Sequence, residues 1–284
     1  MSESTIANQE QREFWSDIKG DLWVTLQPRI DMMLAAFGNK ALDTLDPQSG
    51  ERILEIGCGT GTTTLALGER VGVSGEILAA DLSQPMINKA IERADLGAQH
   101  PITFVEVDAQ VHNFPTAMFD AVYSRFGVMF FDDPVAAFSN IRKAVRPGGR
   151  MAYVCWADRK ANPWIRIPAG AAKAFLDLPA PPPDDAPGQF SMENEGRVQQ
   201  ILHDAGWTDI GLERFTIDGS IGSDAADAAS FITKMGPMSE PFALADLDTQ
   251  NKTLQVIEEA LTPYANDSGV VLGFSTWIVS AMQT

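Results

Sequence analysis

Residue types that build metal centres and disulfide frameworks are scarce in this sequence. It has two cysteines and three histidines among 284 residues. Cys58 and Cys155 each lie in an apolar, strand-like stretch, so they cannot form a disulfide framework, and free cysteines fit a reducing compartment. His112 has no second histidine close enough in the sequence to share a metal ion with it. We therefore expect neither a metal site nor a disulfide.

Basic residues and long apolar runs are lacking too. There are 21 lysines and arginines against 38 acidic residues, and the formal net charge is −17 at pH 7. Such a charge repels phosphate backbones and anionic membranes, which disfavours nucleic acid as a substrate. No apolar run is long enough to span a bilayer, and the polar, acidic residues 2–5 do not resemble a signal peptide. The composition predicts a cytoplasmic protein without a nucleic-acid or membrane partner.

A glycine-rich turn is the most informative feature that is present. An apolar strand, residues 53–56, runs into Gly57, Gly59 and Gly61. These glycines lack the Cβ atoms that keep a ligand away from the backbone, and they tolerate positive φ angles. Thr62 then opens an apolar-periodic stretch typical of a helix, whose first N–H groups face the same crevice. We interpret this as the first βα unit of a nucleotide-binding sheet, with the ligand beyond the carboxyl end of the strand.

Two kinds of protein share such a unit, and Glu55 separates them. The dinucleotide fingerprint G-x-G-x-x-G/A puts its last residue at Thr62, whereas Gly61 comes one position early. Glu55 places a charge at the end of a buried strand, which is unfavourable by several kcal/mol unless a cationic ligand or a buried network pairs it. The spacing of Glu55, Gly57, Gly59 and Gly61 resembles E/D-x-G-x-G-x-G, the first motif of the class I S-adenosylmethionine-dependent methyltransferases.

This resemblance implies a site for the cofactor S-adenosylmethionine along the turn. Gly57, Cys58, Gly59 and Gly61 would cradle the amino-acid part of the cofactor, with Glu55 near its ammonium group through water or backbone. Four further motifs follow in the family's order, so the resemblance extends over about residues 50–157. It is closest to the ubiquinone/menaquinone-type small-molecule subgroup.

Two acids that end later strands complete the expected cofactor site. Asp81 ends the strand 75–81, about twenty residues beyond Gly61, where a carboxylate can accept both hydrogen bonds from a ribose diol. The alternative is a helix cap, a role that Ser83 can also fill. Asp108 ends the strand 102–108 and matches the family position that binds the adenine amino group, whereas an Asx turn is the alternative. Further candidate cofactor contacts are Leu82, Met86, Ala109 and Ser124, and Met86 can equally fill the core.

Few residues in the sequence indicate which molecule accepts the methyl group. After the strand 119–124 the chain lacks the Asn/Asp-Pro-Pro-Tyr/Phe motif of the enzymes that methylate bases, and Ser124-Arg125 supplies no acidic metal ligand. Arg125 can grip a carboxylate or phosphate of the substrate, or it can form a salt bridge to an acid such as Asp132 or Asp133. Candidate pocket residues are Phe126, Trp23 and Trp156, and plain packing is the alternative for Trp23.

The resemblance and the hydrophobic periodicity together predict an α/β fold with a seven-stranded, doubly wound, Rossmann-like sheet. The sheet is expected to be mostly parallel with an antiparallel last strand, and helices are expected to cap it. The expected divisions are an N-terminal helical cap (1–48), a cofactor-binding core (49–223), a helical insertion (224–264) and a closing strand (265–284). The insertion, rich in Met and Phe, either covers an apolar substrate pocket or is a helical hairpin that packs on the sheet or forms a homodimer surface.

The function predicted from these motifs is methyl transfer from S-adenosylmethionine to a small organic acceptor. The nucleophile would be an oxygen, carbon, nitrogen or sulfur atom, and positioning with exclusion of water would supply most of the acceleration of an in-line transfer. Two alternatives remain from the residues alone. One is a nicotinamide-dependent oxidoreductase, and the other is a protein that binds S-adenosylmethionine without turnover.

Overall fold

The computed structural model describes residues 7–16, 18–97, 100–183 and 186–284. The chain forms two compact units. Unit 1 comprises residues 1–155, 186–213 and 277–284, and unit 2 comprises residues 156–185 and 214–276. Residues 156–185, which the sequence division placed in the core, thus belong to the same unit as the helical insertion.

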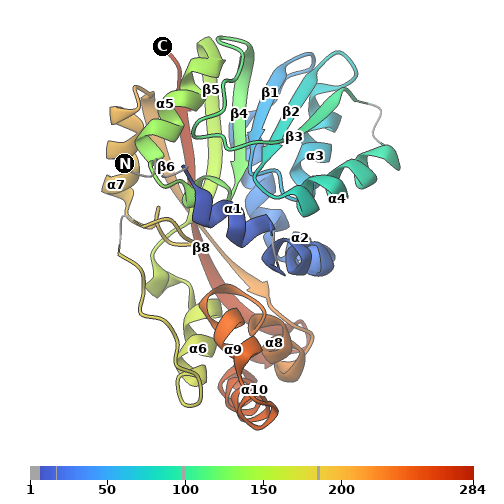
Figure 1. The fold of residues 1–284 in the computed structure, drawn as a ribbon, viewed down its shortest axis with the longest axis vertical. Helices are drawn as coiled ribbons and strands as arrows, with labels where there is room; N and C mark the ends of the chain where they lie inside the picture. Colours follow the sequence, from blue (N-terminus) through green and yellow to red (C-terminus); the bar gives the residue numbers. More distant parts are fainter. Residues whose placement is uncertain (1–6, 17, 98–99, 184–185) are drawn as a thin grey trace, which may run out of the picture. The chain divides into compact units, whose positions relative to one another are not determined.

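A parallel sheet is the centre of unit 1 (Figure 1). Its first five strands are β1 (Arg52–Ile56), β2 (Glu76–Asp81), β3 (Ile102–Glu106), β4 (Phe119–Arg125) and β5 (Val145–Trp156). β1 pairs in parallel with β2 on one side and with β4 on the other. The direction of strand addition therefore reverses between β1 and β4, and in open α/β sheets ligands bind at such a switch point, beyond the carboxyl ends of the strands.

The last strands are antiparallel. In the described residues the strand order is β3-β2-β1-β4-β5-β8-β6, with β6 spanning Thr208–Ser220 and β8 spanning Gly269–Met282. The two-residue strand β7 (Ala265–Asn266) pairs antiparallel with the start of β8. The expected seven-stranded sheet with an antiparallel end is confirmed, and β7 adds an eighth, minimal strand.

Helices surround the sheet (Figure 1), and side-chain caps mark the starts of α4, α5 and α7. Ser83 accepts the backbone N–H of Met86 at the start of α4, and Asp133 accepts that of Ala136 at the start of α5, as expected of N-cap residues. The helices of unit 1 are α1 (Gln9–Ser16), α2 (Ile18–Leu45), α3 (Thr62–Val71), α4 (Gln84–Asp95), η1 (Val128–Phe130), α5 (Pro134–Ala144) and α7 (Glu195–Asp204). No helix in the described part of the chain is long and apolar enough to cross a membrane.

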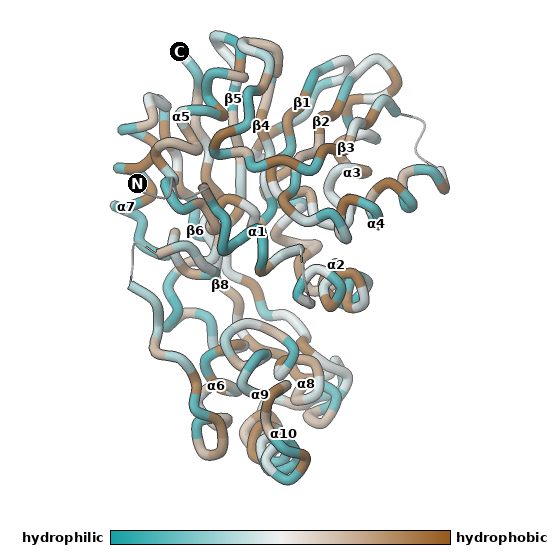
Figure 2. Tube along the Cα trace, in the orientation of Figure 1, coloured by the Kyte–Doolittle hydropathy of each residue, from teal (hydrophilic) through white to brown (hydrophobic). Residues whose placement is uncertain are grey.

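The core of unit 1 lies where the central strands meet their helices. Four of the five residues of β1 are buried, and the alternation typical of a half-exposed strand is absent. Figure 2 shows hydrophobic residues along these strands and mixed colours along the helices. Fully buried side chains such as Ile53, Phe37 and Phe138 each contribute about 1.5–3 kcal/mol relative to exposure.

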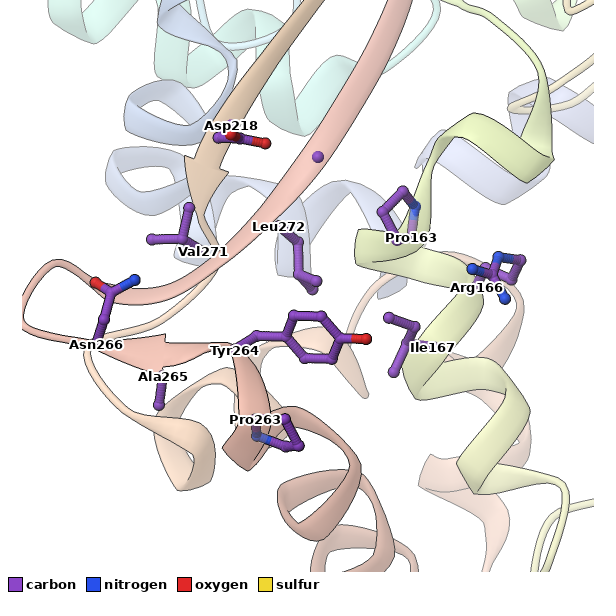
Figure 3. Close-up of a pocket in the computed structure, with 11 residues that line it drawn as sticks. Pro163, Arg166, Ile167, Asp218, Pro263, Tyr264, Ala265, Asn266, Val271 and Leu272 are labelled. Carbon is purple, nitrogen blue, oxygen red and sulfur yellow. The ribbon is translucent and has the colours of Figure 1, made fainter.

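Unit 2 is mainly helical. It contains η2 (Arg159–Ala161), α6 (Pro163–Ala172), α8 (Ala225–Ile232), η3 (Gly236–Met238), α9 (Ser239–Leu244), α10 (Leu247–Leu261) and η4 (Thr262–Tyr264). The buried side chain of Asn162 donates to the carbonyls of Ala157 and Ser275 and accepts the backbone N–H of Ser275, so it ties the start of α6 to β8. This unit contains a groove of about 610 Å³, and Figure 3 shows the Tyr264 ring near Ile167 and Leu272, which also line it.

Two glycines allow the turns after β1 and β4 to touch. A Cβ atom on Gly57 would lie 2.6 Å from the Cα of Gly127, and one on Gly127 would lie 2.8 Å from the Cα of Gly57 and from the Ile56 carbonyl oxygen. Gly127 has φ −81°, so its glycine identity is required by space and not by its backbone angle. Backbone therefore meets backbone at the switch point.

We expect Gly127→Ala to lower the free energy of unfolding by about 1–3 kcal/mol, the usual effect of forcing atoms into a packed site. Urea unfolding would measure the change. Gly170→Ala is the matched control, because nothing lies within 4 Å of its added Cβ and alanine is favoured over glycine in α6 by about 1 kcal/mol. Equal stability of the two variants would contradict the close approach of the turns.

Candidate functional site

The glycine turn presents an open backbone surface between β1 and α3. The N–H groups of Gly57 and Cys58 both donate to the Ala80 carbonyl, at 2.8 and 3.1 Å, which fixes the turn to β2. Gly59 and Gly61 have φ angles of 53° and 82°. The nearest atom to a Cβ on Gly59 would be the Met86 Sδ at 3.8 Å. A group placed against the backbone at Gly59 would thus meet the Met86 side chain only at ordinary contact distance.

Asp81, the last residue of β2, shapes this turn. Its Oδ2 accepts the Gly59 N–H at 2.7 Å and its Oδ1 accepts the Ser83 N–H at 2.9 Å. Burial raises the pKa of Asp81, and these backbone donors oppose the rise. Because Ser83 is the N-cap of α4, Asp81 is not needed as a cap. Each carboxylate oxygen keeps one lone pair for a further donor.

Asp108 lies two residues beyond the end of β3 and keeps one oxygen without a partner. Its Oδ1 accepts the Gln110 N–H at 2.9 Å, an Asx-turn bond, and also the side-chain amide of Asn8 at 2.8 Å. Its Oδ2 is buried and has no hydrogen-bond partner among the described residues. A buried acceptor left in this way is unfavourable by about 1–3 kcal/mol. Both expectations for Asp108, turn formation and an open acceptor, thus have a structural counterpart.

Glu55 is paired by a buried hydroxyl network. Its two carboxylate oxygens accept hydrogen bonds from Thr63 and Thr64 of α3, each at 2.5 Å. The side chain is fully buried, and desolvation raises its pKa to about 7 although both hydroxyls favour the ionised form. Of the two partners expected from sequence, a cationic ligand or a network, the structure contains the network, which fastens α3 to β1.

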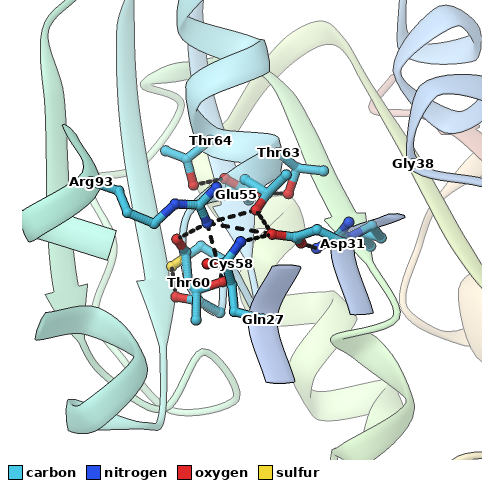
Figure 4. Close-up of polar contacts among 12 residues, drawn as sticks. Gln27, Asp31, Gly38, Glu55, Cys58, Thr60, Thr63, Thr64 and Arg93 are labelled. Atoms are coloured by element: carbon cyan, nitrogen blue, oxygen red, sulfur yellow. Dashed lines mark hydrogen bonds and ion pairs between the residues drawn. The ribbon is translucent and has the colours of Figure 1, made fainter. Parts of the chain in front are cut away.

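Asp31 of α2 connects the N-terminal helices to the glycine turn. Its carboxylate accepts the Thr62 hydroxyl at 2.5 Å and a short hydrogen bond from Gln27. From the other side of the turn, Arg93 of α4 donates to the Thr60 carbonyl and the Thr62 hydroxyl, both at 2.7 Å, and lies 3.6 Å from Asp31. Figure 4 shows Arg93 and Asp31 approaching each other across the turn. The helix α2 is thereby fixed over the start of α3.

Arg125, the last residue of β4, belongs to the same network. Its Nη2 lies 3.0 Å from Asp31 Oδ1, and the two side chains are 11% and 14% exposed. Burial alone would raise the pKa of Asp31, but the hydrogen bonds from Thr62 and Gln27 and the charge of Arg125 hold it below its ordinary value. The salt bridge expected for Arg125 exists, but its partner is Asp31 rather than Asp132 or Asp133.

The other predicted residues gather around the same strand ends, with one exception. Met86 is buried beside Gly59, and the carbonyls of Leu82 and Ala109 accept side-chain bonds from Ser16 and Asn140. Ser124 accepts the Gly127 N–H, and Phe126, with φ 60°, packs on Phe37. Trp23 packs on Trp15, whose ring also meets Phe130. Trp156 is the exception, because it belongs to unit 2 and packs against Trp164 and Phe274.

Sequence reasoning missed three polar residues of this site, Asn8, Asp31 and Arg93. Asn8 lies just before α1, Asp31 lies on α2 and Arg93 lies on α4. Asp31 and Arg93 are only 14% and 21% exposed, and a charge in such a place needs a partner. A charge on the packed face of a helix is the sequence signal for such a residue, and it does not identify the distant partner.

Comparisons with known proteins give a consistent result. Residues 53–149 match a family model described as a methyltransferase domain. The chain is 33% identical over 116 residues to the aklanonic acid methyltransferase DauC of Streptomyces sp. (strain C5), which covers 41% of this chain and 53% of that protein. It is 28% identical over 183 residues to a demethylmenaquinone methyltransferase of Beutenbergia cavernae, covering 62% of this chain and 73% of that protein.

A solved structure extends the likeness in fold to the whole chain. Phosphoethanolamine N-methyltransferase 2 of Haemonchus contortus, in complex with S-adenosyl-L-methionine, superposes with a TM-score of 0.58 at 17% identity. The superposition covers 100% of this chain and 61% of that chain. The first curated relative is matched over about half of its own length, 53%.

We expect the pH dependence of stability to change in Glu55→Gln. With the pKa raised from 4.5 to about 7, the folded protein binds more protons than the unfolded chain between these values. The stability that this carboxyl contributes is therefore present below pH 4.5 and lost as the pH rises through 7. The Gln variant cannot ionise, so its stability relative to the wild type should rise by up to about 3 kcal/mol across this interval. Urea unfolding at several pH values gives the free energy of unfolding of both proteins. If it changed with pH in the same way for the wild type and the variant, the burial of an ionisable Glu55 would be contradicted.

We expect Arg125→Met to lower the free energy of unfolding by about 1–3 kcal/mol, because it leaves a half-buried carboxylate without its closest charge partner. A double-mutant cycle with Asp31→Asn isolates the pair and should give a coupling energy of about 1 kcal/mol or more. A coupling energy near zero would show that the guanidinium is free of Asp31 in solution. Arg142→Met is a control outside this network, because its Nη2 donates to the Thr284 carbonyl.

Proposed function

Because the chain carries a methyltransferase domain in residues 53–149, we propose that it transfers the methyl group of S-adenosylmethionine to a small organic acceptor. The observation that carries the proposal is the arrangement of ligand-binding groups at three adjacent strand ends of this domain. The open backbone of Gly59 follows β1, Asp81 ends β2, and the unpartnered Asp108 oxygen follows β3.

The residues present fit this cofactor in three respects. The backbone at Gly59 is not crowded, since an added Cβ would meet its nearest atom, Met86 Sδ, at an ordinary contact distance of 3.8 Å. Asp81 keeps lone pairs for the hydroxyl groups of a ribose. The buried Oδ2 of Asp108 lacks a donor, and an exocyclic amino group would supply one. Hydrogen-bond acceptors thus stand where a nucleoside offers donors.

The roles of the protein residues in the transfer are binding and orientation. When bound, S-adenosylmethionine supplies an activated methyl group on a sulfonium. Gly59 would hold the amino-acid part, Asp81 the ribose and Asp108 the base, while Gly57 and Gly61 let the turn pack against Gly127 and Ala90. Glu55 holds α3 in place through Thr63 and Thr64, so it acts on the ligand site through the backbone. Holding the reactants in line and excluding water account for most of the acceleration that such a site provides.

The acceptor class is proposed from the names of two relatives and from the residues beside Arg125. Two of the relatives are named for an acid, aklanonic acid, and for demethylmenaquinone. A small aromatic or apolar acceptor is therefore the class we propose, with Phe126 as a wall of the pocket. Asp31 already neutralises Arg125, so an acidic group on the acceptor would have to compete with Asp31 for the guanidinium. The net charge of −17 supports a cytoplasmic protein that acts on small molecules rather than on nucleic acid or at a membrane.

The leading alternative is a nicotinamide-dependent oxidoreductase, and equilibrium binding separates the two. We expect S-adenosylhomocysteine and S-adenosylmethionine to bind more tightly than NAD(H) in isothermal titration calorimetry. Methyl-labelled S-adenosylmethionine should then label one member of a panel of quinols, phenols, carboxylic acids, thiols and amines. Tighter binding of NAD(H) would overturn the proposal. Cofactor binding without labelling of any acceptor in the panel would favour a protein that binds the cofactor without turnover.

We expect Gly59→Ala to weaken S-adenosylhomocysteine binding at least about tenfold, because the added methyl group occupies the surface on which the ligand lies. The variant also carries the strain of a positive φ, about 1 kcal/mol. Gly50→Ala is the matched control, since Gly50 has φ +86° with its nearest neighbour Ser74 at 3.5 Å. Loss of binding in both variants would assign the effect to strain, and unchanged binding in Gly59→Ala would place the ligand elsewhere.

A further inference from the structure

Asn8, just before α1, lies in an unusual position for a residue so near the start of the chain. It is 1% exposed and has φ +50°. Its side-chain amide donates to Asp108 Oδ1 at 2.8 Å and to Gln110 Oε1 at 3.2 Å, across about a hundred residues of sequence. A buried side chain held in a left-handed conformation by distant partners indicates a specific role for its hydrogen bonds.

Asn8 distinguishes the two oxygens of the Asp108 carboxylate. Oδ1 accepts two bonds, from Asn8 and from the Gln110 N–H, and so uses both of its lone pairs. Oδ2 accepts none among the described residues. Without Asn8, only the Gln110 N–H would hold the carboxylate, and either oxygen could take that bond after a rotation about the Cβ–Cγ bond. With Asn8 in place, the free acceptor has one orientation.

The position of Asn8 is itself fixed by the loop after η1. Its Oδ1 accepts the Asp132 N–H at 2.7 Å, and its own N–H donates to Asp132 Oδ2 at 2.5 Å. The following helix α1 buries none of its residues, and Arg12 joins it to Glu106 at 3.1 Å. Trp15 of α1 also packs on Trp23 and Phe130, so aromatic contacts and this ion pair together hold α1. Asp108 Oδ2 is buried, so a ligand donor reaches it only when neighbouring atoms move.

We propose that Asn8 is a positioning residue that fixes Asp108 Oδ2 as an acceptor and so makes the site select a purine with an exocyclic amino group. The proposal rests on the proposed function, because it takes the ligand to be an S-adenosyl compound. Adenine offers an N–H group to this oxygen. Hypoxanthine has a carbonyl at the same position, so its oxygen would face Asp108 Oδ2 and no hydrogen bond could form. Sites with buried, preset hydrogen-bond groups reject such analogues strongly.

The test compares two ligands that differ only at this position, S-adenosylhomocysteine and S-inosylhomocysteine. Their dissociation constants are measured by isothermal titration calorimetry for the wild type and for Asn8→Ala. We expect the wild type to prefer the adenine ligand by roughly a hundredfold. In Asn8→Ala the preference should fall about tenfold, mainly because the adenine ligand binds less tightly. Asn8→Asp keeps the side-chain size but lacks the donors, and it should lose the same preference.

Two matched controls separate selection from docking of the segment. Arg12→Met breaks the ion pair of α1 with Glu106 without touching Asp108. Asn140→Ala removes two amide bonds to the carbonyls of Ala109 and His112, in the same loop as Asp108. Both controls should keep the ratio of the two dissociation constants even where each constant rises.

The outcomes divide cleanly between this inference and the proposed function. A preserved ratio in a folded Asn8→Ala, with melting temperature as the check, would show that Asn8 only docks α1 and would overturn the inference. A wild type that binds both ligands equally would also overturn it and would leave the proposed function standing. If the wild type bound neither S-adenosylhomocysteine nor S-inosylhomocysteine, both the inference and the proposed function would be wrong.

Discussion

The contact between Gly57 and Gly127 is the constraint on which the rest of the site depends. It brings the turns after β1 and β4 together with no side chain between them, at the point where the direction of strand addition reverses. In open α/β sheets this is the place where ligands bind, beyond the carboxyl ends of the strands. Larger residues at either position would separate the two turns and with them every group attached to β1 and β4.

Three buried carboxylates lie at the ends of β1, β2 and β3, and each accepts hydrogen bonds from donors that carry no charge. Glu55 accepts threonine hydroxyls, Asp81 accepts backbone N–H groups, and Asp108 accepts an asparagine amide and a backbone N–H. Neutral donors satisfy part of the hydrogen-bonding capacity and leave the rest for a ligand. A lysine or arginine at these places would neutralise the acids and remove the acceptors that a nucleoside needs. The arrangement therefore explains how a strongly acidic cluster is compatible with a stable core.

Local sequence patterns predicted the fold, but they did not predict the contacts between residues that are far apart in the sequence. The glycine turn, the caps Ser83 and Asp133, and the strands that end near Asp81 and Asp108 are each encoded within a few residues, so periodicity and turn chemistry find them. The bond between Asn8 and Asp108 and the pair of Asp31 with Arg125 join residues about a hundred positions apart. Periodicity shows which face of α2 is buried but not which charge it meets. The partner of Arg125 was for this reason sought among nearby acids, Asp132 and Asp133.

The pairing of Arg125 with Asp31 changes what the acceptor side of the site can select. A free guanidinium would attract any small anion, whereas a paired one offers little net charge and retains N–H donors with fixed directions. Arg93 lies 3.6 Å from the same carboxylate, so two guanidiniums share Asp31. The buried Glu55 also interacts electrostatically with Arg125, so acids as well as bases set the local charge. Because Asp31 lies on α2, the charge that Arg125 offers to an acceptor depends on how firmly α2 is held over the glycine turn, and the Thr62 hydroxyl bond couples the two.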